Sequence, residues 1–117
     1  MTTVNPYLNF NGNTEEAFNF YKSVFGGDFL AVMRFKDNPG CGDIAETDKE
    51  KIMHIALPIG NGTTLMATDS LESQGQKVTF GTNLYICLSP ETREETERLF
   101  SGLSAGGKVE VPLQDMF

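Results

Sequence analysis

The first 35 residues contain a run of local signals that restricts the possible folds more than any other feature of this 117-residue chain. Residues 7–10 alternate in polarity, as a short strand does. Asn13 then suits a helix N-cap, with Glu16 completing a capping box, and the apolar side chains that follow recur at helical spacing. Gly26-Gly27 predicts the end of that helix, and residues 29–35 predict a second strand.

The same order returns near the C-terminus. Residues 84–88 predict a strand, and Ser89-Pro90 predicts an N-cap followed by the proline favoured at the first helical position. Gly106-Gly107 predicts the end of this helix, and residues 108–111 predict another strand. Two matching strand–helix–strand segments indicate an internal duplication.

Between the two copies, the sequence predicts a long exposed loop, a hairpin and a link. Residues 37–51 are rich in Gly, Pro and charged side chains, and a loop of that length is often a lid or a binding loop. Residues 52–59 and 64–68 predict two strands, joined by the tight turn Gly60-Asn61-Gly62. Residues 70–77 predict a polar link without periodicity.

Composition excludes several classes of protein. The formal net charge of −7, with no stripe of Lys or Arg, argues against nucleic acid as a partner. No apolar run approaches the roughly 20 residues that span a bilayer, so we expect no membrane segment. Cys41 and Cys87 are isolated, without framework spacing, which favours a reduced, cytoplasmic location. We expect Cys87 to be a small core residue and Cys41 to be exposed.

Five motifs, in order and at matching spacing, resemble the PhnB-like branch of the glyoxalase/bleomycin resistance/dioxygenase (vicinal oxygen chelate) superfamily. They are Pro6-Tyr7-Leu8-Asn9-Phe10, Glu16-Ala17-Phe18 with Phe20-Tyr21, Val24-Phe25-Gly26-Gly27, Met53-His54-Ile55-Ala56-Leu57 and Leu65-Met66-Ala67-Thr68-Asp69. The resemblance runs from residue 5 to 117. It implies an α+β fold of paired βαβββ modules, whose strands form a curled mixed sheet.

On this resemblance, residues 1–117 form a single domain with three parts. Module one takes about 5–69, a linker 70–81, and a partial module two about 82–117. The second module lacks the sequence for its last two strands, so we expect it to be truncated. An unpaired sheet edge favours pairing with another chain, which predicts a homodimer.

Metal-dependent members of the superfamily take His and Glu ligands from the inner faces of four strands. The matching positions here are Tyr7 or Asn9 on the first strand, Asp69 at the end of the fourth, and Leu84 or Tyr85 on the fifth. Asp69 is the one weak candidate ligand, and it can equally start the following turn. We therefore predict no intact metal centre and no other cofactor within this chain.

His54 is the single histidine, and alternation places it with Ala56 on the face opposite Ile55 and Leu57. It is a candidate pocket residue and the one weak candidate for a catalytic base, or else a structural histidine. Tyr7 and Asn9 share a strand face suited to orienting a ligand, although Asn9 can instead satisfy the adjacent turn.

Three further side chains complete the candidate pocket. Arg34 could hold an anion or lie at an exposed edge. Met66 could contact a ligand, although a methionine on a strand is more often in the core. Tyr85 occupies the corresponding strand of the second module.

These residues support a cytoplasmic small-molecule-binding protein, metal-free in this form. The alternative is a metal-dependent lyase, isomerase or dioxygenase, whose site is completed by a missing C-terminal part or by a partner chain. A third possibility is a subunit with a vestigial pocket. Some PhnB-like proteins are labelled demethylubiquinone methyltransferases, but the sequence has no glycine-rich strand–turn–helix motif for a nucleotide or adenosyl cofactor.

Overall fold

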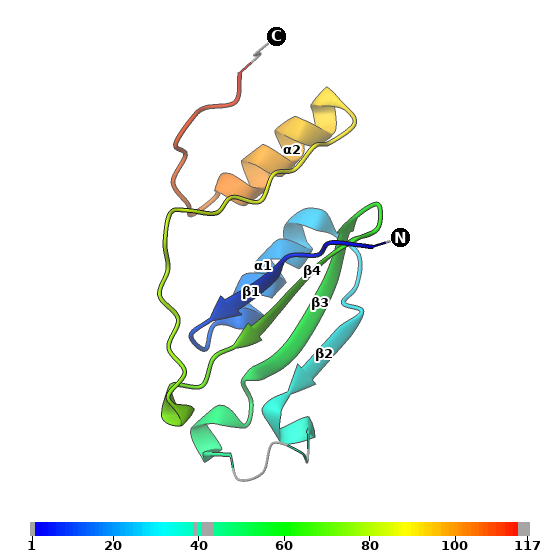
Figure 1. The fold of residues 1–117 in the computed structure, drawn as a ribbon. Coiled ribbons are helices and arrows are strands. Elements are labelled where there is room, and N and C mark those ends of the chain that lie inside the picture. The colour runs from blue at the N-terminus through cyan, green and yellow to red at the C-terminus, as the bar shows by residue number, and fades with distance from the viewer. Residues whose placement is uncertain (1, 39, 41–43, 115–117) are drawn as a thin grey trace. The chain divides into compact units, whose positions relative to one another are not determined.

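The computed structural model of the protein describes residues 2–38, 40 and 44–114. The chain divides into two compact units, Met1–Leu84 and Tyr85–Phe117 (Figure 1).

The first unit is an α+β module with the order βαβββ. Its four-stranded mixed sheet has the strand order β1-β4-β3-β2, in which β1 is parallel to β4 and the other pairs are antiparallel. The elements are β1 (Tyr7–Phe10), α1 (Thr14–Phe25), β2 (Ala31–Arg34), β3 (Ile52–Gly60) and β4 (Thr63–Asp69). This confirms the first predicted module, but the sheet curves gently and is not strongly curled, contrary to our expectation (Figure 1).

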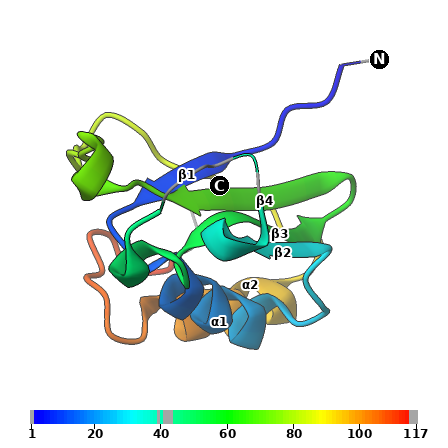
Figure 2. The same cartoon turned by 90° about the horizontal axis from the view of Figure 1, so that it is seen from below.

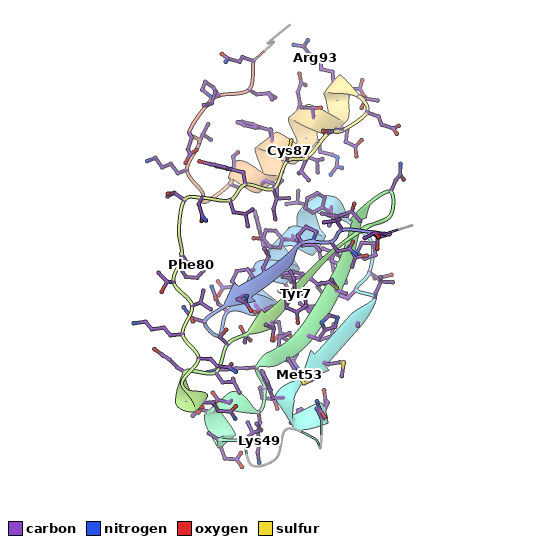
Figure 3. The ribbon with its side chains drawn as sticks, in the orientation of Figure 1. Tyr7, Lys49, Met53, Phe80, Cys87 and Arg93 are labelled. Atoms are coloured by element: carbon purple, nitrogen blue, oxygen red, sulfur yellow. The ribbon has the colours of Figure 1, made fainter. Side chains whose placement is uncertain are left out.

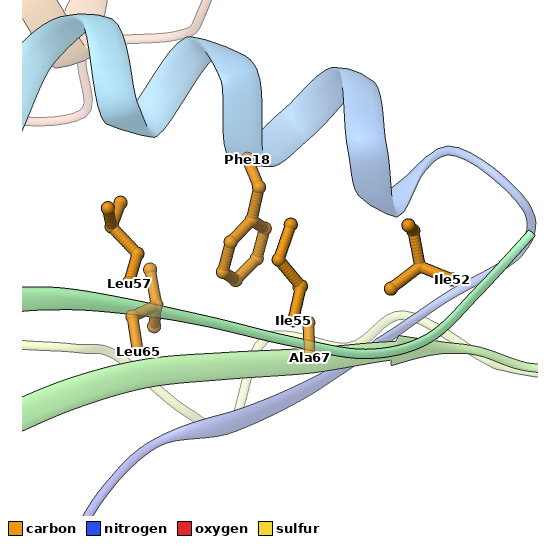
Figure 4. Packing of buried hydrophobic residues seen from close by; sticks show 6 residues of the cluster. All are labelled: Phe18, Ile52, Ile55, Leu57, Leu65 and Ala67. Atoms are coloured by element: carbon orange, nitrogen blue, oxygen red, sulfur yellow. The ribbon is translucent and has the colours of Figure 1, made fainter. Parts of the chain in front are cut away.

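Helix α1 covers one face of this sheet and forms the core with it (Figure 2). Phe18 of α1 is fully buried against apolar side chains of β3 and β4, among them Ile55 and Leu57 (Figure 4). Burying one such side chain contributes roughly 1.5–3 kcal/mol, so this contact fixes which face of the sheet meets the helix. As predicted, α1 ends at Phe25, where Gly26 follows with a φ of 81°.

The start of α1 differs from the prediction. The Asn13 side chain makes no capping hydrogen bond, so the expected capping box does not form. Instead, Oδ1 of Asp69 accepts hydrogen bonds from the backbone N–H groups of Gly12 and Thr14, both at 3.0 Å. A carboxylate from the end of β4 therefore caps the helix, and local sequence could not show this.

The β2–β3 pairing contains a bulge. Met33 pairs with His54 but the next residue, Arg34, pairs with Ile52, so Met53 is the extra residue. The bulge lets both Ile52 and Ile55 reach the core while His54 points to the other face. The predicted hairpin between β3 and β4 is confirmed.

The loop 37–51 and the polar link are more ordered than predicted. Short 3-10 turns form at Phe35–Asp37, Glu46–Asp48 and Glu72–Gln74, although positions 39 and 41–43, which include Cys41, lie outside the described residues. The link is attached to the first unit at two points. Ser73 donates to Asp48 at 2.5 Å, and the Asn11 side chain exchanges two hydrogen bonds of 3.2 Å with the backbone of Val78.

The second unit contains α2 (Arg93–Ser104). The predicted cap at Ser89 is wrong: the helix begins after Thr92, whose Oγ1 accepts a hydrogen bond from the Glu95 N–H. Residues 84–88 and 108–111 form no strand, because a strand needs a partner for its backbone hydrogen bonds and none of the described segments pairs with them. Cys87 is consequently exposed and is not the core residue expected.

Within the ranges that the structure describes, neither helix has the length and apolar character needed to cross a membrane.

Candidate functional site

The face of the sheet opposite α1, here called the open face, brings together several of the predicted pocket residues. Tyr7 lies on β1 (Figure 3). Its ring lies beside that of His54 on β3, with ring centroids 5.9 Å apart and planes inclined by 29°. Their strands are separated by β4, so the two rings meet above it. The prediction that His54 faces away from the helix is confirmed.

Strand register places further side chains beside this ring pair. Met66 pairs with Tyr7 and with Ala56, Thr68 pairs with Asn9, and Met33 pairs with His54. Paired residues point to the same face of a sheet. The sequence analysis named Tyr7, Asn9, His54 and Met66 as pocket candidates, but it missed Met33 and Thr68. Alternation along their strands could have placed these two on the same face, but only with the strand register known.

Three polar groups on the open face have no hydrogen-bond partner within the part of the chain that the structure describes. Among the described residues, nothing hydrogen-bonds to the Tyr7 hydroxyl, the Asn9 amide or the His54 imidazole, and Tyr7 is 48% exposed. The described residues therefore leave the donors and acceptors of these three groups open to a ligand.

Arg34 lies away from this ring pair. Its guanidinium donates to both carboxylate oxygens of Glu15 on α1, at 3.1 and 2.5 Å, and to the backbone carbonyl of Glu50 at 2.7 Å. The hydrogen bond from Arg34 lowers the pKa of the Glu15 carboxyl, and the same bond raises the pKa of Arg34. Arg34 thus joins the helix to the strand and does not meet Tyr7 or His54.

Asp69, the candidate metal ligand, is 2% exposed and faces the helix. Its Oδ1 accepts from Gly12 N, Thr14 N and the Thr14 hydroxyl at 2.6 Å, and its Oδ2 accepts from Ile52 N at 2.8 Å. Both oxygens are engaged by protein donors and the side chain is buried toward the helix, so in this structure Asp69 joins segments of the fold and does not line the open face.

The other positions expected to match metal ligands do not fit either. Tyr7 and Asn9 are poor ligands for a first-row divalent ion, and His54 is a single imidazole. In the ranges 2–38, 40 and 44–114, no three His, Cys, Asp or Glu side chains lie close enough together to hold a metal ion. The described residues therefore do not match the metal centre that the resemblance implies.

Two features of the described chain were not found from sequence. Asp48, which is buried, accepts from Lys51 at 2.8 Å and from Ser73, and these two hydrogen bonds lower its pKa. No local pattern marks it, because Ser73 approaches from the linker. In the second unit, a hollow of about 510 Å³ is lined by Arg93, Thr96, Glu97, Leu113 and Gln114.

Tyr85 belongs to the second unit, where it is 73% exposed and its hydroxyl lies 3.2 Å from Glu110 Oε2.

Comparison with known proteins supports the family resemblance. Protein YjdN of Escherichia coli is 29% identical over 122 residues, a match that covers 97% of this chain and 80% of YjdN. The crystal structure of protein PA1353 from Pseudomonas aeruginosa has a TM-score of 0.85 at 36% identity, covering 99% of this chain and 82% of that one. The PhnB protein of Bacillus cereus has a TM-score of 0.68 at 28% identity, covering 95% and 80%.

One family model matches residues 2–115, and its description is 3-demethylubiquinone-9 3-methyltransferase. With the PhnB-like relatives and the βαβββ module, this match confirms the resemblance predicted from sequence, and the chain belongs to this PhnB-like family with a glyoxalase-like fold.

Proposed function

We propose that this chain is a small-molecule-binding protein whose ligand lies on the open face of the sheet, beside Tyr7 and His54. The observation that supports this most directly is the ring pair itself. Two aromatic side chains stack on a face that no helix of the first unit covers, and their polar atoms have no partner among the described residues. A β-bulge beside His54 also fits, since bulges often re-aim a side chain next to a binding site.

Binding is proposed here without an enzymatic step. The family description names a methyl transfer, but the turn before α1 is closed by protein contacts. Gly12 N–H is bonded to Asp69, and Asn11 is bonded to Val78. The Gly12 N–H and the Asn11 side chain are therefore not available to hold a nucleotide-like cofactor. We do not extend the methyltransferase activity to this chain.

The single histidine provides the test. The chain has one imidazole, so one pair of ring-proton NMR signals reports on His54 without assignment ambiguity. A fragment library should yield ligands that shift these signals, and Tyr7→Ala should weaken those ligands at least tenfold. His54→Ala should weaken them at least tenfold as well, with binding to this variant followed by the NMR signals of the ligand because the imidazole is absent. Leu30→Ala is the matched control, because Leu30 is exposed outside the strands and should leave binding unchanged. Failure of every fragment to shift the His54 signals would refute the proposal.

The metal-dependent alternative is tested in the same samples. Since the described residues do not supply a metal site, ligands would have to come from outside the described residues or from a partner chain. Adding Zn²⁺, Mn²⁺ or Ni²⁺ would then raise the melting temperature. Diamagnetic Zn²⁺ would shift the His54 signals, and the paramagnetic ions Mn²⁺ and Ni²⁺ would broaden them. No thermal shift with any of these ions is the result that we expect.

We also propose a cytoplasmic homodimer with paired modules. Leu84, Ile86, Val109 and Val111 are exposed apolar residues in segments that have a strand-like sequence but pair with no described strand. A second copy could supply backbone hydrogen bonds and cover these side chains. Light scattering should give twice the monomer mass, and a monomer at all concentrations would contradict this.

A further inference from the structure

We infer that the β-bulge near the start of β3 forms a site for a soft monovalent metal ion, Cu⁺, held by the sulfur atoms of Met33 and Met53 and by the imidazole of His54. The inference does not depend on the small-molecule ligand proposed above, although both involve His54. Three properties of the described residues support it: the direction of the side chains at the bulge, the chemistry of the three donors, and the surrounding charge.

The bulge turns two consecutive side chains away from the core. In a regular strand, neighbours along the chain point to opposite faces of the sheet. Here Ile52 and Ile55 both pack in the core, so Met53 and His54, the two residues between them, both lie outside it and are half-buried (Figure 3). His54 pairs with Met33 on β2, and Met53 is the extra residue beside this pair. The bulge therefore makes two methionines and the histidine immediate neighbours.

The three donor atoms are close enough to reach one ion. The Cα atoms of cross-strand partners such as Met33 and His54 lie about 4.5–5.5 Å apart, and those of chain neighbours such as Met53 and His54 about 3.8 Å apart. Methionine is unbranched and has three rotatable bonds, so its sulfur can turn toward an ion while the backbone stays in place. Met33 is 39% exposed, which leaves its side chain room for this rotation.

The chemistry of these donors selects a soft ion. Thioether sulfur favours Cu⁺ and imidazole nitrogen also binds copper, whereas Mg²⁺ and Mn²⁺ favour carboxylate oxygens. The His54 ring nitrogens have no hydrogen-bond partner among the described residues. The Met53 sulfur accepts a hydrogen bond from Asn38 Nδ2 at 3.1 Å, and because sulfur is a weak acceptor, an ion can replace this bond at little cost. The set of two sulfurs and one nitrogen also differs from the His and Glu ligands of the superfamily's metal centres.

The surrounding charge favours a cation. The formal net charge of the chain is −7, and Arg34, the cation that follows Met33 on β2, donates to both carboxylate oxygens of Glu15 on α1. All three proposed ligands are neutral, so the bound site carries only the single charge of the ion. A monovalent ion loses less hydration energy than a divalent ion on entering such a half-buried site. Charge and ligand type therefore agree on Cu⁺.

Titration of the full chain with Ag⁺ tests the site, because Ag⁺ shares the preference of Cu⁺ for sulfur and keeps its oxidation state in air. The chain carries Cys41→Ser and Cys87→Ser, since a thiolate would bind the same ion elsewhere. We expect one Ag⁺ to bind per chain in calorimetry. In NMR spectra, Ag⁺ should shift the His54 ring protons and the methyl signals of Met33 and Met53.

Matched leucine variants of the same chain locate the ligands. Met33→Leu and Met53→Leu keep the size of the side chain but remove the sulfur, and each should weaken Ag⁺ binding at least tenfold. Met66→Leu is the control, because Met66 pairs with Tyr7 and Ala56, away from the bulge, and it should change the affinity less than twofold. Anaerobic competition with a coloured Cu⁺ chelator should give the same order of affinities for Cu⁺.

Several results would overturn the inference. They are a cysteine-free chain that binds no Ag⁺, equal weakening by Met33→Leu and Met66→Leu, and binding of Ag⁺ without binding of Cu⁺. Should Met53→Leu fail to fold, Met33→Leu decides alone, because this exposed side chain contributes little to the core. None of these results bears on the fragment screen, which contains no metal ion, so the proposed small-molecule site and the metal site stand or fall separately.

Discussion

Replacing Asp69 by asparagine should destabilise the first unit strongly, although the two side chains have nearly the same shape. The carboxylate joins three segments, since it accepts from the turn before α1, from the Thr14 hydroxyl and from the N–H of Ile52 at the start of β3. In the asparagine variant, Oδ1 can still accept at the helix N-terminus. The new Nδ2, however, would face the Ile52 N–H, and both groups are donors.

The magnitude follows from these contacts. Leaving the buried Ile52 N–H without a partner costs about 1–3 kcal/mol. The hydrogen bonds that remain at the helix N-terminus lose their charged acceptor. A hydrogen bond to a charged group is worth about 1.5–3 kcal/mol and a neutral one about 0.5–1.5 kcal/mol, so this change adds about 1 kcal/mol to the loss. The expected loss is therefore about 2–4 kcal/mol in the free energy of unfolding, a large part of the roughly 5–15 kcal/mol of a typical domain.

Urea unfolding at pH 7, followed by tyrosine fluorescence and circular dichroism, measures this loss. Asp28→Asn is the matched control, because the Asp28 side chain is 96% exposed, lies 3.6 Å from Lys22 and should cost less than about 0.5 kcal/mol. Thr14→Val removes only the hydroxyl bond and should cost about 1 kcal/mol. If Asp69→Asn proves as mild as Asp28→Asn, the carboxylate does not hold these segments together.

Three further changes test other contacts. Glu15→Gln should cost less than about 1 kcal/mol at pH 7, since the pair is partly exposed. The pKa of Glu15 in the folded state lies below its usual 4.5, so the ionised carboxylate contributes its stability above pH 4.5. As the pH falls through the folded-state pKa, this contribution is lost. Urea melts of Glu15→Gln and wild type should then give the same free energy of unfolding. Asn11→Ala should release the linker and speed trypsin cleavage after Lys77 severalfold, as peptide mass mapping would show. Thr92→Ala should lower the helicity of α2 in NMR chemical shifts, with a cost of about 1 kcal/mol, whereas Asn13→Ala should leave α1 unchanged.

Internal comparisons control these experiments. Cleavage after Lys108, in the second unit, should proceed at the same rate in Asn11→Ala and wild type, and faster cleavage at both sites would indicate general destabilisation. For Glu15→Gln, a difference from wild type that persists at low pH would show that the lost stability does not come from the ionised pair. Equal loss of helicity in Thr92→Ala and Asn13→Ala would contradict the assignment of the caps.

The sequence predicted those parts of the fold that depend on neighbours along the chain. The apolar spacing that buries Phe18, the glycine after Phe25 and the turn before Thr63 were all found correctly, because helix periodicity and tight turns depend on nearby residues. The side of β3 on which His54 lies was also found, because alternation assigns a strand residue to one face once its neighbours are known to be buried.

The tertiary structure decided what depends on distant partners. Asp69 caps a helix that begins 55 residues earlier in the chain. No sequence pattern around Asn13 could show that the Asp69 carboxylate, and not the Asn13 side chain, would accept the hydrogen bonds at the helix N-terminus. Register across four strands likewise decided that Tyr7 meets His54 and that Ala31 lies beside Ala56.

The second copy of the repeat shows the same distinction. Its helix forms, at Arg93–Ser104, since a helix satisfies its backbone hydrogen bonds within itself. Residues 84–88 and 108–111 have the composition of strands, but a strand takes its hydrogen bonds from a neighbour, and no described segment supplies one. The sequence by itself thus determined the repeated order of elements, while tertiary pairing decided which of them became a sheet and which side chains share its open face.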